Sequence, residues 1–120
     1  MEIEEYIKSQ IVFWSKKLHL SLFTITCKLD NTVSYLSCHI NHPYLNVCIN
    51  YSNKVVEEYK EGKDISEHIL HELCHIITEP MYLLCFERFI SQNEIEDTRE
   101  RCTDHISTIV FRIVEGLNGD

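Results

Sequence analysis

The residues of this chain best suited to chemistry are His71, Glu72 and His75, in the segment His-Glu-Leu-Cys-His. Two histidines four positions apart on a helix project from one face, one turn apart, so both imidazoles can reach one metal ion. A glutamate beside them can take a proton from a water on that metal and later donate it to a leaving amine. Neutral imidazoles suit Zn²⁺, which lowers the pKa of its water to roughly 7. The pattern predicts a Zn²⁺ centre with Glu72 as the general base and acid.

A third protein ligand is expected, because a catalytic zinc ion usually has three protein ligands and one water. The last predicted helix carries acidic residues that could supply it: Glu94, Glu96, Asp97, Glu100 and Asp104. Three of them, Glu96, Glu100 and Asp104, are four residues apart and therefore lie on successive turns of one side. Such a row is often only a solvated face, but here it flanks an apolar stripe on a helix that must pack in a small domain.

The elements before the motif follow from the period of the apolar residues. Ile3, Ile7, Ile11 and others recur every three or four residues and predict a helix over Glu2–Leu18. Alternation with a period of two then predicts three strands, at Phe23–Leu29, Thr32–Ile40 and Leu45–Tyr51. Because the connections between them are short, we expect an antiparallel meander.

After the strands the pattern becomes helical. We expect a short helix around Val55–Tyr59 that ends near Gly62, and a motif helix that begins at Asp64 and ends before Pro80. Residues 81–90 suggest a packed helix or a compact loop. A long helix then covers Asn93–Leu117, with an apolar stripe through Ile95, Cys102, Ile106, Ile109, Ile113 and Leu117 that Val110 and Val114 widen. Gly116 and residues 118–120 resemble an unwound tail. The class is α+β, with the long C-terminal helix carrying the third ligand.

Composition restricts the setting of this site. The chain has 120 residues, 44% of them hydrophobic, which is enough for one domain over residues 1–120. A net charge of −8 argues against binding nucleic acid or an anionic membrane, since both favour basic surfaces. No apolar run is long enough to cross a bilayer. The acidic start is unlike a secretory signal, so we expect the six cysteines to be reduced and the protein to be cytoplasmic.

The order of these elements resembles the gluzincin zinc metallopeptidases, especially the single-domain minigluzincins and short phage or mobile-element peptidases. Glu100–Ser107 is similar to their third-ligand motif, in which a glutamate binds zinc and an acidic residue four positions later supports a zinc-bound histidine. The resemblance implies that His71, His75 and Glu100 hold Zn²⁺ and that Asp104 orients a ligating imidazole. Ser107 fits the small residue at the close approach of the two helices.

The resemblance also implies a peptide or protein substrate. The Leu45–Tyr51 strand, if it borders the cleft, could pair with an extended peptide. Larger gluzincins carry a further domain with an oxyanion-stabilising His or Tyr, for which this chain has no room. Tyr44, Tyr51 and Tyr82 are the candidates here, and nothing in the sequence chooses among them.

Three alternatives stay open at this point. Glu96 could be the third ligand with Glu100 behind it, although Glu100 lies nearer the apolar run that begins at Ile106. The domain could bind zinc without catalysis, for structure or for a partner. It could also be a peptidase of one partner protein, with His105 as the third ligand. The sequence is silent on the oligomeric state. We expect His39, His42 and His68 to be ordinary surface histidines.

Overall fold

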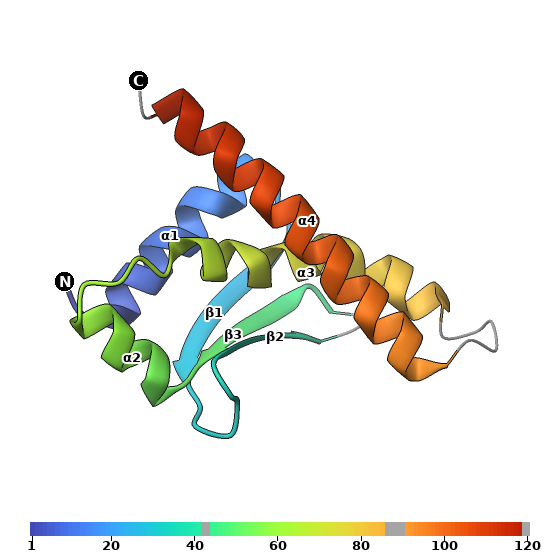
Figure 1. The fold of residues 1–120 in the computed structure, drawn as a ribbon, viewed down its shortest axis with the longest axis horizontal. Coiled ribbons are helices and arrows are strands. Elements are labelled where there is room, and N and C mark those ends of the chain that lie inside the picture. The colour runs from blue at the N-terminus through green and yellow to red at the C-terminus, as the bar shows by residue number, and fades with distance from the viewer. Residues whose placement is uncertain (42–43, 86–90, 119–120) are drawn as a thin grey trace. The chain divides into compact units, whose positions relative to one another are not determined.

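The structure is a computed structural model that describes residues 1–41, 44–85 and 91–118, and within them it is α+β, as predicted (Figure 1). Its elements in chain order are α1 (Ile3–Lys17), β1 (Thr24–Leu29), β2 (Leu36–Asn41), β3 (Asn46–Tyr51), α2 (Asn53–Lys60), α3 (Ser66–Cys85) and α4 (Gln92–Asn118). Ile7, Ile11 and Trp14 are buried on one side of α1, as the predicted stripe requires.

The sheet differs from the predicted meander, because its strand order is β1-β3-β2. β3 is parallel to β1, from Thr24 opposite Asn46 to Leu29 opposite Tyr51, and antiparallel to β2. Figure 1 shows β3 between the other two strands. The prediction of a purely antiparallel meander is therefore wrong, and the sheet is mixed.

The reason lies in the segment between β1 and β2. We predicted that the second strand begins at Thr32, which would leave a tight turn, but β2 begins only at Leu36. The longer connection passes over the end of β3, a distance of about two strand spacings, or roughly 10 Å. It is held there by hydrogen bonds from the Asp30 amide to the Tyr51 carbonyl, 2.8 Å, and from the Ser52 amide to the Tyr35 carbonyl, 3.0 Å.

The central position of β3 also overturns a functional expectation. Each of its residues from Asn46 to Tyr51 is paired with a neighbour on both sides. A peptide can extend a sheet only at an unpaired edge. The prediction that the Leu45–Tyr51 strand accepts an extended substrate is therefore wrong.

The short helix and the start of the motif helix agree with the sequence patterns. α2 ends before Gly62, whose φ of 84° is the left-handed conformation typical of a residue after a helix. α3 begins at Ser66, two residues after the predicted start at Asp64. There Asp64 Oδ1 accepts hydrogen bonds from the Ser66 amide, 2.9 Å, and from the Ser66 hydroxyl, 2.7 Å. Asp64 thus caps the helix from just outside it.

α3 continues through Pro80 to Cys85, so the prediction that it ends before Pro80 is wrong. A proline inside a helix removes one backbone hydrogen bond and costs about 3 kcal/mol. Contacts with α4 on both sides of the proline offset that cost. Before it, Thr78 contacts Thr103; after it, Tyr82 contacts Arg99. Of the predicted helix or loop over 81–90, residues 81–85 are helical and residues 86–90 lie outside the described part.

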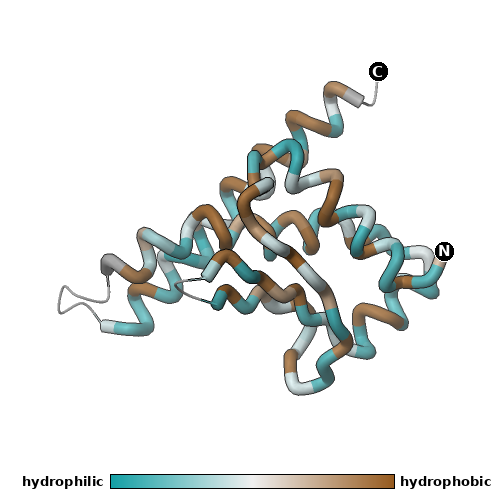
Figure 2. Tube along the Cα trace, turned by 180° about the vertical axis from the view of Figure 1, so that it is seen from behind, coloured by the Kyte–Doolittle hydropathy of each residue, from teal (hydrophilic) through white to brown (hydrophobic). Residues whose placement is uncertain are grey.

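α4 buries only part of the predicted apolar stripe, together with small residues that the stripe did not include. Ile95, Thr103, Ser107 and Val114 are buried, whereas the exposed hydrophobic residues include Ile109, Ile113 and Leu117. Apolar residues occur on more than one side of this helix, so their spacing alone does not identify the buried side. Figure 2 shows hydrophobic residues recurring toward its C-terminal end. Gly116 lies within the helix and not in an unwound tail.

Two compact units are present, Met1–Leu73 and Cys74–Asp120, and their boundary falls inside α3. The first has a core of aliphatic side chains on its helices and sheet, including Ile7, Ile49, Val55, Ile65 and Ile69. The second contains the C-terminal part of α3 together with α4. The single domain over residues 1–120 stays a prediction.

Four cysteines agree with the expected reduced state. Cys27, Cys48, Cys74 and Cys102 are free thiols. Burial raises the pKa of the Cys74 thiol to about 12. This thiol is therefore neutral near pH 7, although it lies beside His75. Among the described helices, none combines the length and apolar character needed to cross a membrane.

Replacing the capping residue of α3 should destabilise the first unit. Asp64→Ala should lower the free energy of unfolding by about 1 kcal/mol, the usual cost of losing a cap, measured by urea denaturation at pH 7. The hydrogen bonds from Ser66 hold the pKa of Asp64 below its usual value. Protonation therefore favours the unfolded state, and the difference from wild type should shrink as the pH falls below about 4. Glu67→Ala, in the same helical turn, is the control, and an equal loss there would contradict the assignment.

Candidate metal centre

His71, Glu72 and His75 meet on one turn of α3. Each offers one ligand atom, and these atoms all lie within 4.8 Å of one another. His71 and Glu72 are half-buried and His75 is 8% exposed. The spacing of four residues brings the two imidazoles together, as the sequence predicts. This group could hold a metal ion.

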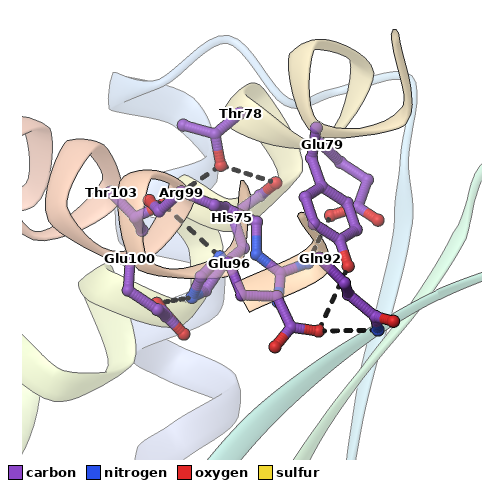
Figure 3. Close-up of polar contacts among 9 residues, drawn as sticks. His75, Thr78, Glu79, Gln92, Glu96, Arg99, Glu100 and Thr103 are labelled. Carbon is purple, nitrogen blue, oxygen red and sulfur yellow. Dashed lines mark hydrogen bonds and ion pairs between the residues drawn. The ribbon is translucent and has the colours of Figure 1, made fainter. Parts of the chain in front are cut away.

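Contacts with α4 fix the position of the His75 ring (Figure 3). Its Nε2 lies 3.0 Å from Oε2 of Glu100. Its Nδ1 lies 3.4 Å from the hydroxyl of Thr103. The imidazole therefore has an oxygen atom at each of its two nitrogens.

Counting the hydrogens that the Thr103 hydroxyl and the His75 ring can donate indicates where a cation fits. The Thr103 hydroxyl donates its hydrogen to the Arg99 carbonyl at 2.8 Å, a shorter contact than the 3.4 Å to His75. Thr103 is then an acceptor toward Nδ1, while the Glu100 carboxylate is an acceptor toward Nε2. A neutral imidazole has only one N–H and cannot donate to both. A cation at Nε2 would let the ring keep its one hydrogen on Nδ1, toward Thr103.

The distance between His75 and Glu100 also suits a shared metal ion. Two ligands with bonds of about 2.0–2.1 Å at a tetrahedral angle are roughly 3.3 Å apart. The 3.0 Å between Nε2 and Oε2 is close to this value. The side chain of Glu100 is 53% exposed, so an ion there is reachable from solvent.

Glu96, the other candidate for the third ligand, has different partners. Its Oε1 accepts hydrogen bonds from the Gln92 amide, 3.1 Å, and from the Tyr82 hydroxyl, 3.4 Å. The Tyr82 ring lies under the Arg99 guanidinium, 3.9 Å from its centroid, and Arg99 also pairs with Glu79 at 3.5 Å. Figure 3 shows Glu100 in contact with His75 and Glu96 in contact with Gln92.

Two further predicted site residues, Asp104 and His105, lie at the surface of α4, whereas Ser107 is buried. Asp104 is exposed, and its backbone carbonyl accepts a hydrogen bond from the Ser107 hydroxyl at 3.0 Å. Its predicted role of orienting an imidazole stays a prediction. His105, the alternative third ligand, is exposed as well. Ser107 is 1% exposed, as expected for a small residue at a close helix approach.

The other histidines behave as surface groups where the structure describes them. His39 is exposed in β2, and His68 is exposed with its ring against that of Tyr35, 5.2 Å between centroids. His42 lies outside the described residues.

The three tyrosines considered for the oxyanion differ in their surroundings. Tyr44 is 64% exposed, whereas Tyr51 is 6% exposed and burial raises the pKa of its phenol. The hydroxyl of Tyr82 donates to Glu96, and partial burial is the main reason that its pKa is raised. None of this selects one of them for the role.

Two residues of the site were not anticipated from the sequence, Thr103 and Thr78. Thr103 lies three residues after Glu100, so helical spacing places both on the same side of α4. The sequence therefore contained a signal that Thr103 lies near Glu100. However, threonine is common on helix surfaces, and the acidic Asp104 next to it was the more conspicuous candidate. Thr78 lies beyond His75 on α3, close to the proline at which we expected the helix to end.

Comparison with protein-family models, with curated proteins and with solved structures gives no match. The resemblance to the gluzincins therefore depends on the two sequence motifs and on the order of the elements.

The two candidate carboxylates can be separated by metal titration. With Zn²⁺ as the probe ion, Glu100→Ala should weaken binding by more than the roughly 10–100-fold typical of losing an outer-shell partner, because a direct ligand is lost. Glu96→Ala removes the same type of side chain one turn away and should change the affinity little. If Glu96→Ala loses the metal and Glu100→Ala keeps it, the assignment is one turn wrong. Asp104→Ala should cost about 10–100-fold if Asp104 orients a ligand.

Proposed function

We propose that the protein is a zinc-dependent peptidase that hydrolyses peptide bonds with the help of Glu72. The observation that carries this proposal is the contact of 3.0 Å between His75 Nε2 and Glu100 Oε2, on the helix turn where His71, Glu72 and His75 converge. It brings a carboxylate from α4 to a histidine of the motif, which is the relation that a third ligand requires.

Zinc is the metal that these donors suit best. Two imidazole nitrogens and one carboxylate oxygen are a common set of protein ligands for catalytic zinc. Magnesium and calcium favour sites made of oxygen atoms alone. We therefore infer that His71, His75 and Glu100 hold Zn²⁺. When bound, the ion would polarise a scissile carbonyl and lower the pKa of a water molecule to near 7.

The role left for Glu72 is proton transfer. Its carboxylate is half-buried beside the two histidines, within 4.8 Å of their ligand atoms. From there it can accept the proton of an attacking water and later donate it to the leaving amine. One residue can thus act first as the base and then as the acid. Partial burial keeps the carboxylate near the reacting atoms while solvent still reaches it. The substrate class, a peptide or protein chain, follows from the gluzincin resemblance and is part of the proposal.

Removing the base should separate metal binding from catalysis. Glu72→Gln should keep the fold and bind zinc, while its rate of peptide hydrolysis falls by at least about 10²-fold, the usual scale for losing a general base. The measurements are zinc stoichiometry of the purified protein and chelator-sensitive cleavage of a denatured protein substrate. Glu67→Gln, an exposed change on the same helix, should leave the rate unchanged.

Two results would count against the proposal. A zinc-loaded Glu72→Gln variant with wild-type activity would exclude Glu72 as the base. A wild-type protein that binds one zinc ion per chain yet cleaves no peptide bond, even in a proteome-wide substrate screen, would indicate a zinc-binding domain without catalysis.

A further inference from the structure

We propose that Thr103 is a positioning residue of the metal centre: its hydroxyl holds the His75 ring with Nδ1 protonated, so that Nε2 presents its lone pair to the metal. This inference rests on the proposed function, because it concerns the same site. It assigns to an uncharged side chain a task that the gluzincin resemblance gives to an acidic residue.

The argument begins with the burial of the hydroxyls behind the His75 ring. Thr103 is 0% exposed and Thr78 is 3% exposed. Water is therefore excluded, and the hydrogen bonds of these side chains must be completed by protein groups. A threonine hydroxyl can donate one hydrogen bond and accept two.

The observed neighbours of Thr103 Oγ1 match that capacity. It donates to the Arg99 carbonyl at 2.8 Å. Its two further contacts are Thr78 Oγ1 at 3.1 Å and His75 Nδ1 at 3.4 Å. Thr78 Oγ1 also donates to the His75 carbonyl at 3.3 Å. Because the hydrogen of Thr103 points to Arg99, Nδ1 forms a hydrogen bond with Thr103 Oγ1 only by donating to it. Nδ1 can do so only when it carries a hydrogen.

The other tautomer of His75 would leave this group of side chains short of hydrogen bonds. Nδ1 would then be an acceptor facing an oxygen whose hydrogen is used elsewhere, at a ring that is only 8% exposed. An unsatisfied buried polar atom costs about 1–3 kcal/mol. With a hydrogen on Nδ1, Nε2 has a lone pair that points to the side of Glu100, where the metal would bind.

Thr103 differs from Asp104 in a way that matters for the metal. A carboxylate at this place would add a negative charge and raise the basicity of the ligand, whereas a hydroxyl only fixes the ring and its tautomer. In the structure, the hydroxyl of Thr103 contacts the ring of His75 at Nδ1. This contact is the reason for assigning the positioning of the His75 ring to Thr103.

Three variants test the role of the Thr103 hydroxyl. Thr103→Val keeps the shape and removes the hydroxyl, and it should weaken zinc binding by about 10–100-fold, as loss of an outer-shell partner does. Thr103→Ser keeps the hydroxyl and should restore most of the affinity. Thr98→Val makes the same change at an exposed position of α4, so it should leave the affinity close to wild type. Zinc affinity is measured by competition with a chelator of known affinity, on variants whose circular dichroism confirms the fold.

A spectroscopic readout distinguishes positioning from a general loss of packing. Long-range ¹H–¹⁵N correlation spectra of the zinc-loaded full chain should show His75 bound through Nε2 and protonated at Nδ1 in the wild type and in Thr103→Ser. In Thr103→Val the Nδ1 hydrogen, no longer held by a partner, should exchange faster with solvent.

The outcomes are distinct from those of the peptidase proposal. If the wild type binds zinc and Thr103→Val binds it equally tightly, or if His75 binds through Nδ1, the role of Thr103 is overturned while the peptidase proposal stands. If the wild type binds no zinc, the proposed function is overturned, and this inference with it.

Discussion

A neutral imidazole carries one hydrogen on its two nitrogens, and this limit governs the contacts within the second unit. His75 has a hydroxyl at Nδ1 and a carboxylate at Nε2, and both partners come from α4. Because the hydroxyl donates to the Arg99 carbonyl, its contact with Nδ1 is a hydrogen bond only if the ring supplies the hydrogen. The other nitrogen of a neutral ring then faces Glu100 without a hydrogen. A cation between Nε2 and the carboxylate resolves this conflict, as does protonation of the ring. The His75 ring therefore links the buried hydroxyl of Thr103, at Nδ1, to the exposed carboxylate of Glu100, at Nε2.

The continuity of α3 beyond Pro80 supplies the rest of these contacts. Thr78 and Glu79 lie just before the proline and Tyr82 just after it, and all three contact residues of α4. A helix that ended before Pro80 would lack the turn that carries Tyr82. The Arg99 side chain joins both sides, because it pairs with Glu79 and lies over the ring of Tyr82. The broken backbone hydrogen bond is therefore tolerated where side-chain contacts are dense.

Most local patterns were predicted correctly, apart from the end of α3 at Pro80. Most non-local arrangements were not, apart from the approach of Glu100 to His75. The helical spacing of His71 and His75, the burial of the α1 stripe and the end of α2 at Gly62 depend on neighbours a few residues away, so the sequence contains the necessary information. The strand order depends on where β2 begins, a shift of four residues from Thr32 to Leu36 that alternation alone does not reveal. The contact of Thr103 with His75 depends on how α4 is rotated about its axis. That rotation is set by small buried side chains, which apolar periodicity does not identify.

The place of β3 between β1 and β2 has a consequence for how the first unit assembles. β1 and β2 follow each other along the chain but share no backbone hydrogen bonds, so neither has a partner until β3 has been synthesised. β2 and β3 are joined by only a few residues, and their antiparallel pairing closes a small loop. The parallel pairing of β1 with β3 encloses the whole of β2 and closes a larger one, at a greater loss of chain entropy. We therefore expect the β2–β3 pair to form first and the addition of β1 to limit the folding rate.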